Sequence, residues 1–296
     1  MHEAGIWSTV LGLASLLALA VLMVPVARRL AFPFTVLLAL VGIGLGVGAH
    51  SLEALHLPGI SDFFQALHRL EITADAVLFV FLPALVFEAA LAMNVRRLLE
   101  DLAPIVFLAV FGLLLSTVLI GASLAAVSGV GLVACLMLGA ICSATDPVAV
   151  VAIFKEVGAP KRLAILVEGE SLFNDATAIV LFTLLAAILT EGSAPTVAAG
   201  VLDFLRVFLG GIAVGLVLGR VFVALLARLG GEALAERSLT VALAYLAFLL
   251  GEHYLHVSGV MAVVTAALVV SARGPSVLSP EHWHGLHETW EQLGFW

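Results

Sequence analysis

The sequence predicts an all-α polytopic membrane protein. Of its 296 residues, 62% are hydrophobic and only 11% are charged, and its mean hydropathy is +1.19. Soluble domains carry about 25% charged residues. Apolar runs of about 20 residues, the length that an α-helix needs to cross a bilayer, recur along the chain. Because lipid offers the backbone no hydrogen-bond partner, these runs are predicted to be helices, and the short alternating strands of a porin-like barrel are not expected.

The order of apolar and polar segments predicts nine spans. Residues 50–72 are polar enough to form a loop, with room for a short interfacial helix. After the ninth span, Arg273-Gly274-Pro275 predicts another loop, and the Trp- and His-rich end of the chain resembles the start of a further span. The predicted spans are residues 7–27, 33–49, 73–93, 103–127, 130–154, 162–190, 198–227, 237–255 and 258–272.

Basic residues predict the orientation of these spans. Lys and Arg follow the odd-numbered spans, as in Arg28-Arg29 and Arg96-Arg97, whereas the opposite loops contain only Arg69. Basic loops stay cytoplasmic, so the N-terminus is predicted to lie outside. The 13 Lys and Arg are scattered at segment ends and the net charge is −8, which gives no indication of a nucleic-acid surface.

Two aspartates lie inside these apolar runs. A carboxylate at the centre of a bilayer costs roughly 2.5–3.5 kcal/mol on insertion scales, so such residues are typical of proton or cation sites. Asp146 lies in Ser143-Ala144-Thr145-Asp146-Pro147, and Asp175 ends Glu170-Ser171-Leu172-Phe173-Asn174-Asp175.

Pro147 predicts a break in the fifth span. Proline lacks a backbone N–H, its ring clashes with the carbonyl four residues earlier, and it disfavours helical geometry in the preceding residue. The helix should therefore break near residues 144–146, with Asp146 beside the positive end of a half-helix and Thr145 supplying a hydroxyl and carbonyls. The alternative is a proline-kinked packing helix with Asp146 as a cap.

The sixth span adds oxygen ligands at helical spacing. Ser171 and Asp175 are four residues apart and share a face, Glu168 extends that face by a turn, and Glu170 and Asn174 form a second such pair. Carboxylate, hydroxyl and carbonyl oxygens suit a hard cation such as Na⁺, and Asp175 can instead hold a proton. A purely structural polar network is the alternative, and Glu168 can equally be a residue near the cytoplasmic helix end.

Two further features carry weaker signals. Glu88 is a third acid within an apolar run and follows Pro83, although it could also pair structurally or lie near the inner interface. The tail contains His282 and His284, whose spacing permits a metal site. An interfacial segment anchored by aromatic residues such as Trp290 is favoured instead.

Together these motifs resemble the monovalent cation/proton antiporters, in particular the electroneutral branch of bacterial NhaP-type proteins and animal sodium/proton exchangers. Asn174-Asp175, in place of two aspartates, resembles that branch. The resemblance extends from about residue 10 to the end of the chain. Its segments are Ala144-Thr145-Asp146-Pro147, Glu168-Gly169-Glu170-Ser171-Leu172-Phe173-Asn174-Asp175, Phe81-Leu82-Pro83-Ala84-Leu85-Val86-Phe87-Glu88 and His256-Val257-Ser258-Gly259-Val260-Met261-Ala262.

The resemblance implies roles for these residues. Asp175 would be the essential ion-binding acid, with Thr145, Asp146, Ser171 and Glu88 completing the site. Asn174, Glu170 and Pro147 would support it, and Glu170 would pair with an arginine on a late helix that this sequence does not show. The cargo would be Na⁺, or alternatively K⁺ or Li⁺, exchanged for H⁺ without a cofactor.

The resemblance also implies an inverted-repeat fold with a discontinuous helix in a homodimer of the cell membrane. On this reading residues 1–190 form the first repeat, 198–227 the linking helix and 237–296 the start of the second repeat, so that the chain is expected to be truncated after about nine spans. The implied protein is a secondary active antiporter and not an enzyme. An intramembrane aspartyl protease and an ion channel are the alternatives from other classes.

Overall fold

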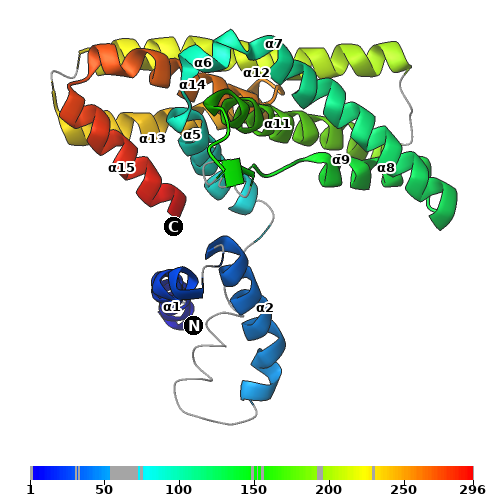
Figure 1. Ribbon diagram of the computed structural model, residues 1–296, viewed down its shortest axis with the longest axis horizontal. Helices are drawn as coiled ribbons and strands as arrows, with labels where there is room; N and C mark the ends of the chain where they lie inside the picture. The colour runs from blue at the N-terminus through cyan, green and yellow to red at the C-terminus, as the bar shows by residue number, and fades with distance from the viewer. Residues whose placement is uncertain are drawn as a thin grey trace. The chain divides into compact units, whose positions relative to one another are not determined.

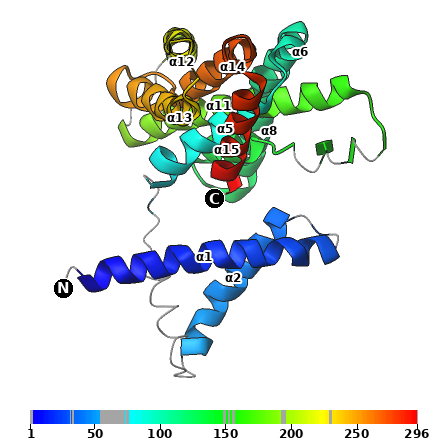
Figure 2. The same cartoon turned by 90° about the vertical axis from the view of Figure 1, so that its left-hand side faces the viewer.

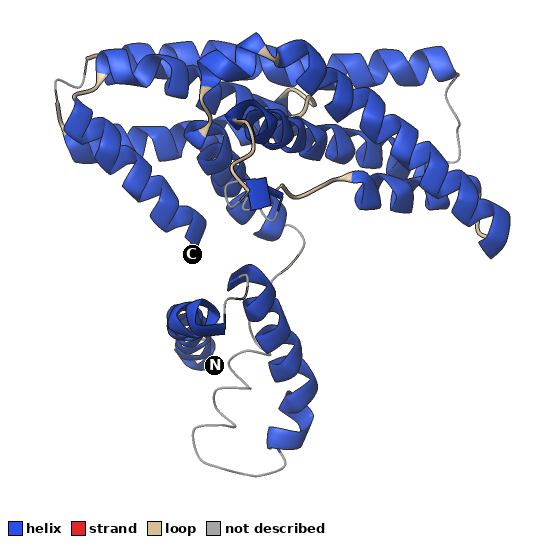
Figure 3. Cartoon of the chain, in the orientation of Figure 1, coloured by secondary structure: helices blue, strands red, loops and turns tan. Residues whose placement is uncertain are grey.

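The computed structural model describes residues 3–30, 32, 34–53, 73, 76–147, 150–151, 153–154, 157–191, 196–228 and 231–295. Figure 3 shows that the regular structure of these residues is entirely helical, which confirms the predicted fold class. The chain divides near residue 74 into two compact units.

The described residues of the first unit form two helices, α1 (Glu3–Leu30) and α2 (Phe34–Glu53) (Figure 2). Large apolar side chains are exposed along both helices, as at Leu22 and Ile43, which are each 63% exposed. This is the surface expected of helices that face lipid. Most of the predicted loop at 50–72 lies outside the described residues.

The second unit holds the remaining helices (Figure 1). They are η1 (Val77–Phe81), α5 (Leu82–Ala92), α6 (Val95–Glu100), α7 (Leu102–Phe107), η2 (Leu108–Gly112), α8 (Leu113–Ser128), α9 (Leu132–Ser143), α11 (Lys161–Glu191), α12 (Val197–Leu226), α13 (Ala233–Leu249), η3 (Leu250–Tyr254), α14 (Gly259–Val277) and α15 (Pro280–Phe295).

Each of the nine predicted spans contains an apolar helix. Within the described residues, six helices are long and apolar enough to cross a membrane, and three shorter apolar helices cover residues 36–47, 77–92 and 132–143. The six are Val10–Leu30, Leu102–Ser128, Lys161–Thr190, Ala198–Leu226, Ala233–Tyr254 and Gly259–Val277.

A wide π turn precedes the proline of the third span. The N–H of Leu82 bonds the carbonyl of Val77, five residues back, and α5 then begins with Pro83 near its first position. Proline is tolerated there because the first N–H groups of a helix have no intrahelical partner. The helix therefore continues past Pro83 and carries Glu88 on its second turn.

The core of the second unit is centred on α14, which is buried at nearly every position from Gly259 to Ala267. Glycines on α12 allow this close approach. A Cβ added at Gly215 would lie 2.3 Å from the Ala262 carbonyl oxygen, and one at Gly211 would lie 2.4 Å from that of Ser258. Small residues bring membrane helices together because packing, and not exclusion from water, drives their association.

The tail differs from its prediction in two ways. The loop predicted at Arg273-Gly274-Pro275 is wrong, since α14 continues to Val277; Gly274 packs against the Trp283 ring, which stabilises the additional turn. Trp290 also does not face outward, as an interfacial aromatic anchor would. Trp290 is 1% exposed, stacks on Phe87 with ring centroids 4.3 Å apart, and anchors the polar helix α15 to α5.

Candidate ion-binding site

The fifth span is broken where proline predicts it. Helix α9 ends at Ser143, residues 144–147 are not helical, and Ala144 has extended backbone angles (φ −70°, ψ 131°). Helical bonding resumes at once beyond the break, since the N–H of Val151 donates to the Pro147 carbonyl at 2.8 Å. The described residues 150, 151, 153 and 154 beyond the break are helical, so Thr145 and Asp146 lie on unwound backbone between two helical segments.

Helix α11 holds this unwound segment through side-chain hydrogen bonds. The Ser171 hydroxyl donates to the Thr145 carbonyl. The Asn174 amide donates one N–H to the Thr145 hydroxyl oxygen at 2.9 Å and the other to the Glu170 carboxylate at 2.8 Å. The Thr145 hydroxyl in turn donates to Glu170 at 3.4 Å. Thr145, Glu170, Ser171 and Asn174 therefore form one connected network.

Three carboxylates gather around this network. Asp146 on the break and Glu170 on α11 are the charged groups that act electrostatically on Asp175. The Asp175 side chain is exposed and makes no hydrogen bond to any described residue, whereas Glu170 accepts two. Because like charges repel one another, a proton or a cation bound at Asp175 would relieve that repulsion.

Glu88 lies in a different environment. Its carboxylate faces α15, where a Cβ added at Gly294 would lie 3.1 Å from Oε2 and where Glu291 is its charged neighbour. Among the described residues, the charged neighbours of Asp175 are Asp146 and Glu170, and Glu88 is not one of them. Its place in the ion site therefore stays a prediction.

The end of α9 has a support that the sequence reasoning did not identify. The Ser143 hydroxyl donates to the Gly139 carbonyl at 2.6 Å and accepts from the buried Thr117 hydroxyl of α8 at 3.4 Å. A Cβ added at Gly139 would lie 2.6 Å from the Thr117 carbonyl oxygen. The spacing Gly139–Ser143, four residues apart on one helix face, was the available signal.

A second feature that the sequence reasoning missed is an ion pair at the N-terminal end of α11. Arg162 donates two hydrogen bonds to Asp101 Oδ1, from Nη2 at 2.6 Å and from Nε at 3.0 Å, and Nε also approaches Oδ2 at 3.0 Å. This guanidinium holds the pKa of the Asp101 carboxyl below its usual range. The pair joins α11 to the start of α7, although the two residues are 61 positions apart, so no local pattern could reveal it.

Comparison with known proteins identifies the family. The model of the sodium/hydrogen exchanger transmembrane family matches residues 15–295. The chain belongs to the sodium/hydrogen exchanger family. It is therefore a multi-span membrane protein of a family of ion exchangers, as the motifs around Asp146 and Asp175 had indicated.

Curated relatives of this exchanger family member carry antiporter names. The chain is 37% identical over 264 residues to the Na(+)/H(+) antiporter ApNhaP of Aphanothece halophytica, covering 89% of this chain and 47% of that protein. It is 32% identical over 282 residues to the Na(+)/H(+) antiporter NhaH of Halobacillus aidingensis, covering 94% and 68%. The chain thus spans about half the length of the first relative and about two thirds of the second.

A solved structure shows the same fold. The sodium proton antiporter MjNhaP1 from Methanocaldococcus jannaschii, determined at pH 8, matches with a TM-score of 0.76 over 98% of this chain and 68% of that one. The sequence identity is 24%, so this likeness concerns the fold. It places the exchanger-family chain in the antiporter fold that the sequence predicted.

Proposed function

We propose that this protein is a secondary active antiporter that exchanges a monovalent cation, Na⁺, for H⁺ at Asp175 by alternating access, and that it is not an enzyme. The observation that carries the proposal is the environment of the Asp175 carboxylate. Its side chain is exposed, makes no hydrogen bond to any described residue, and has Asp146 and Glu170 as charged neighbours beside an unwound helix. Unwound backbone in a membrane is tolerated where it lines a cavity and supplies ion ligands.

The chemistry of exchange follows from competition for one carboxylate. A proton on Asp175 removes one of three negative charges, and a cation offsets that charge without removing it. The two ligands therefore exclude each other at this carboxylate. Oxygen atoms of Thr145, Asp146 and Ser171 are the proposed additional ligands of the cation, since a hard cation prefers oxygen donors.

The names of the relatives and the distribution of charge along the chain support the remaining parts of the proposal. The relatives' names support Na⁺, whereas a carboxylate and hydroxyl site also admits Li⁺ or K⁺. We also propose the cell membrane as its location, an outward N-terminus from the distribution of Lys and Arg, and a homodimer. The family likewise supports H⁺ and a monovalent cation, with no cofactor, as its ligands.

The test compares two aspartates in reconstituted liposomes. Asp175→Asn should abolish Na⁺-driven proton movement and the binding of ²²Na⁺ to the purified protein. Asp203→Asn, which removes an exposed carboxylate on α12, should leave both unchanged. Binding is measured beside transport because the chain spans about half the length of ApNhaP. Wild-type exchange and binding in Asp175→Asn would overturn the proposal, and the same assay with K⁺ and Li⁺ determines the cation.

A further inference from the structure

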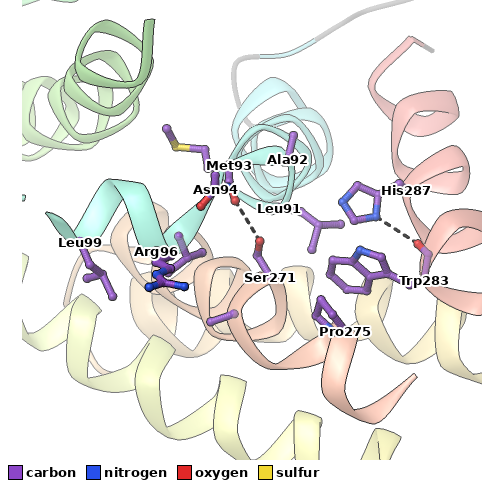
Figure 4. A pocket seen from close by; sticks show the side chains of 12 residues that line it. Leu91, Ala92, Met93, Asn94, Arg96, Leu99, Ser271, Pro275, Trp283 and His287 are labelled. Atoms are coloured by element: carbon purple, nitrogen blue, oxygen red, sulfur yellow. Dashed lines mark hydrogen bonds between the residues drawn. The ribbon is translucent and has the colours of Figure 1, made fainter. Parts of the chain in front are cut away.

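A cavity of about 560 Å³ lies where the junction of α5 and α6 meets α14 and α15 (Figure 4). Its wall is mostly apolar, with Leu91, Pro275 and Trp283 among the lining residues, and Arg96 is the charged residue of the lining. None of these residues belongs to the proposed ion site.

Most polar groups of this wall already have partners within the protein. The Ser271 hydroxyl donates to the Met93 carbonyl at 3.0 Å, and the Asn94 side chain accepts from the backbone of α6 at 3.2 Å. His287 Nδ1 lies 3.1 Å from the Trp283 carbonyl oxygen. Since a carbonyl only accepts, Nδ1 carries the proton of the neutral ring, which leaves Nε2 as an acceptor.

An apolar groove begins at the edge of this cavity. It has a volume of about 620 Å³ and runs along α7 into η2, and Leu99 lines both the cavity and the groove. The rings of Phe107 and Phe111 stack in it, 5.1 Å apart and 60% and 61% exposed. The two hollows share Leu99 at their edge, with Arg96 on the side of the cavity and the two phenylalanine rings on the side of the groove.

The Arg96 side of the cavity lies at the boundary of a membrane span. The candidate span Leu102–Ser128 begins two residues after Glu100, whose carboxylate lies 3.8 Å from the Arg96 guanidinium. These two side chains are 65% and 91% exposed, so their charges are available to a ligand. The charge pair is therefore expected at the depth of lipid headgroups and the groove at the depth of acyl chains.

We propose that this site binds a phospholipid with a phosphoethanolamine headgroup. The phosphate accepts hydrogen bonds from Arg96, and the primary ammonium donates to the neighbouring Glu100 carboxylate. One acyl chain follows the groove past Leu99 toward Phe111. A phosphocholine headgroup has no N–H to donate, and a phosphoglycerol headgroup brings no positive charge to Glu100, so both should bind more weakly.

Native mass spectrometry of the delipidated, purified protein tests the proposal. Phosphatidylethanolamine, phosphatidylcholine and phosphatidylglycerol with identical acyl chains are titrated separately. We expect one saturable phosphatidylethanolamine, bound about fivefold tighter than either other lipid, which is the scale of one exposed ion pair. Arg96→Gln should weaken the binding of all three, whereas Glu100→Gln should abolish the preference and favour phosphatidylglycerol. Arg228→Gln, an exposed arginine outside the site, is the matched control.

A photoreactive phosphatidylethanolamine locates the acyl chain independently. A diazirine on the chain should label the peptide that contains Phe107 and Phe111, and Arg96→Gln should reduce that label. Equal binding of the three lipids, unchanged binding in both variants, or a label spread evenly over other spans would show ordinary annular lipid and overturn the proposal. Inorganic phosphate that competes fully with the lipid would also overturn it, since the headgroup alone would then account for the site.

Discussion

Replacing Asn174 with alanine should loosen the break in the fifth span without changing any charge of the site. The Asn174 amide is the donor that reaches both the Thr145 hydroxyl on the break and the Glu170 carboxylate on α11. The side chain is 1% exposed, so water cannot readily replace it. Asn174→Ala therefore removes two hydrogen bonds from the network that fixes the unwound segment.

The magnitude follows from the two bonds. A neutral hydrogen bond contributes about 0.5–1.5 kcal/mol, and one to a charged group about 1.5–3 kcal/mol. Thr145 and Glu170 still bond each other in the variant, so neither is left wholly unpaired. We expect a loss of about 2–3 kcal/mol in the free energy of unfolding, or roughly 3–5 °C in melting temperature for a protein of this size.

Two measurements check this prediction. The melting temperature is followed in detergent by intrinsic fluorescence, and amide exchange is followed at residues 144–146, which should exchange faster in the variant. Asn174→Asp should be more damaging, because it places a carboxylate against Glu170. Thr183→Val is the control on the same helix, since it removes only a local bond to the Ile179 carbonyl at an exposed position.

The reasoning would be refuted by an Asn174→Ala protein that melts within 1 °C of the wild type and shows unchanged exchange at the break. A double-mutant cycle with Thr145→Val sharpens the result. If the two side chains interact as the 2.9 Å bond indicates, the coupling energy should be about 0.5–1.5 kcal/mol, whereas additive effects would mean that α11 does not hold the break through this bond.

Three further predictions concern packing and charge. Gly215→Ala should destabilise the protein by about 1–3 kcal/mol, because the new Cβ would meet a carbonyl of α14 at 2.3 Å, and the melting temperature should fall. Gly200→Ala is the control and should leave the melting temperature unchanged, because nothing lies within 4 Å of its Cβ position. Trp290→Phe should lower the free energy of unfolding by about 1–2 kcal/mol, because the indole N–H no longer donates its 3.1 Å hydrogen bond to a buried threonine of α13. An unchanged melting temperature would contradict this prediction. The ion pair with Arg162 lowers the pKa of Asp101 in the folded protein. The pair therefore stabilises the fold at pH values above about 4, the pKa of Asp101 in the unfolded chain, and this stabilisation is lost as the pH falls below that value. Asp101→Asn should therefore lower the melting temperature at pH 7 and flatten its fall in acid.

The sequence was sufficient to predict the elements of the fold. Long apolar runs report burial in lipid directly, and each of the nine contains an apolar helix. The break before Pro147 could also be predicted, because the missing N–H and the ring clash are properties of proline itself. The helical conformation of Arg273-Gly274-Pro275 could not be predicted from such local properties. There the contact of Gly274 with Trp283 extends the helix, and local propensity carries no information about such a tertiary contact.

The site was predictable only where its residues share a helix. Glu170 and Asn174 are four residues apart, and their hydrogen bond follows from helical spacing. The bonds from Ser171 and Asn174 to Thr145 cross between two spans and depend on how α9 packs on α11. The place of Glu88 in the site stays a prediction from the resemblance, since its neighbours in this structure lie on α15.

The hydrogen bonds of the site also indicate why one carboxylate is left for the ion. Glu170 accepts hydrogen bonds from Thr145 and Asn174, which hold its carboxylate in place. Asp175 has no hydrogen-bond partner among the described residues, so its negative charge is compensated only when a ligand arrives. An asparagine at 174 keeps that position neutral, whereas an aspartate there would add a further charge beside Glu170. Position 174 thus limits the negative charge that a proton or cation bound at the proposed site would have to neutralise.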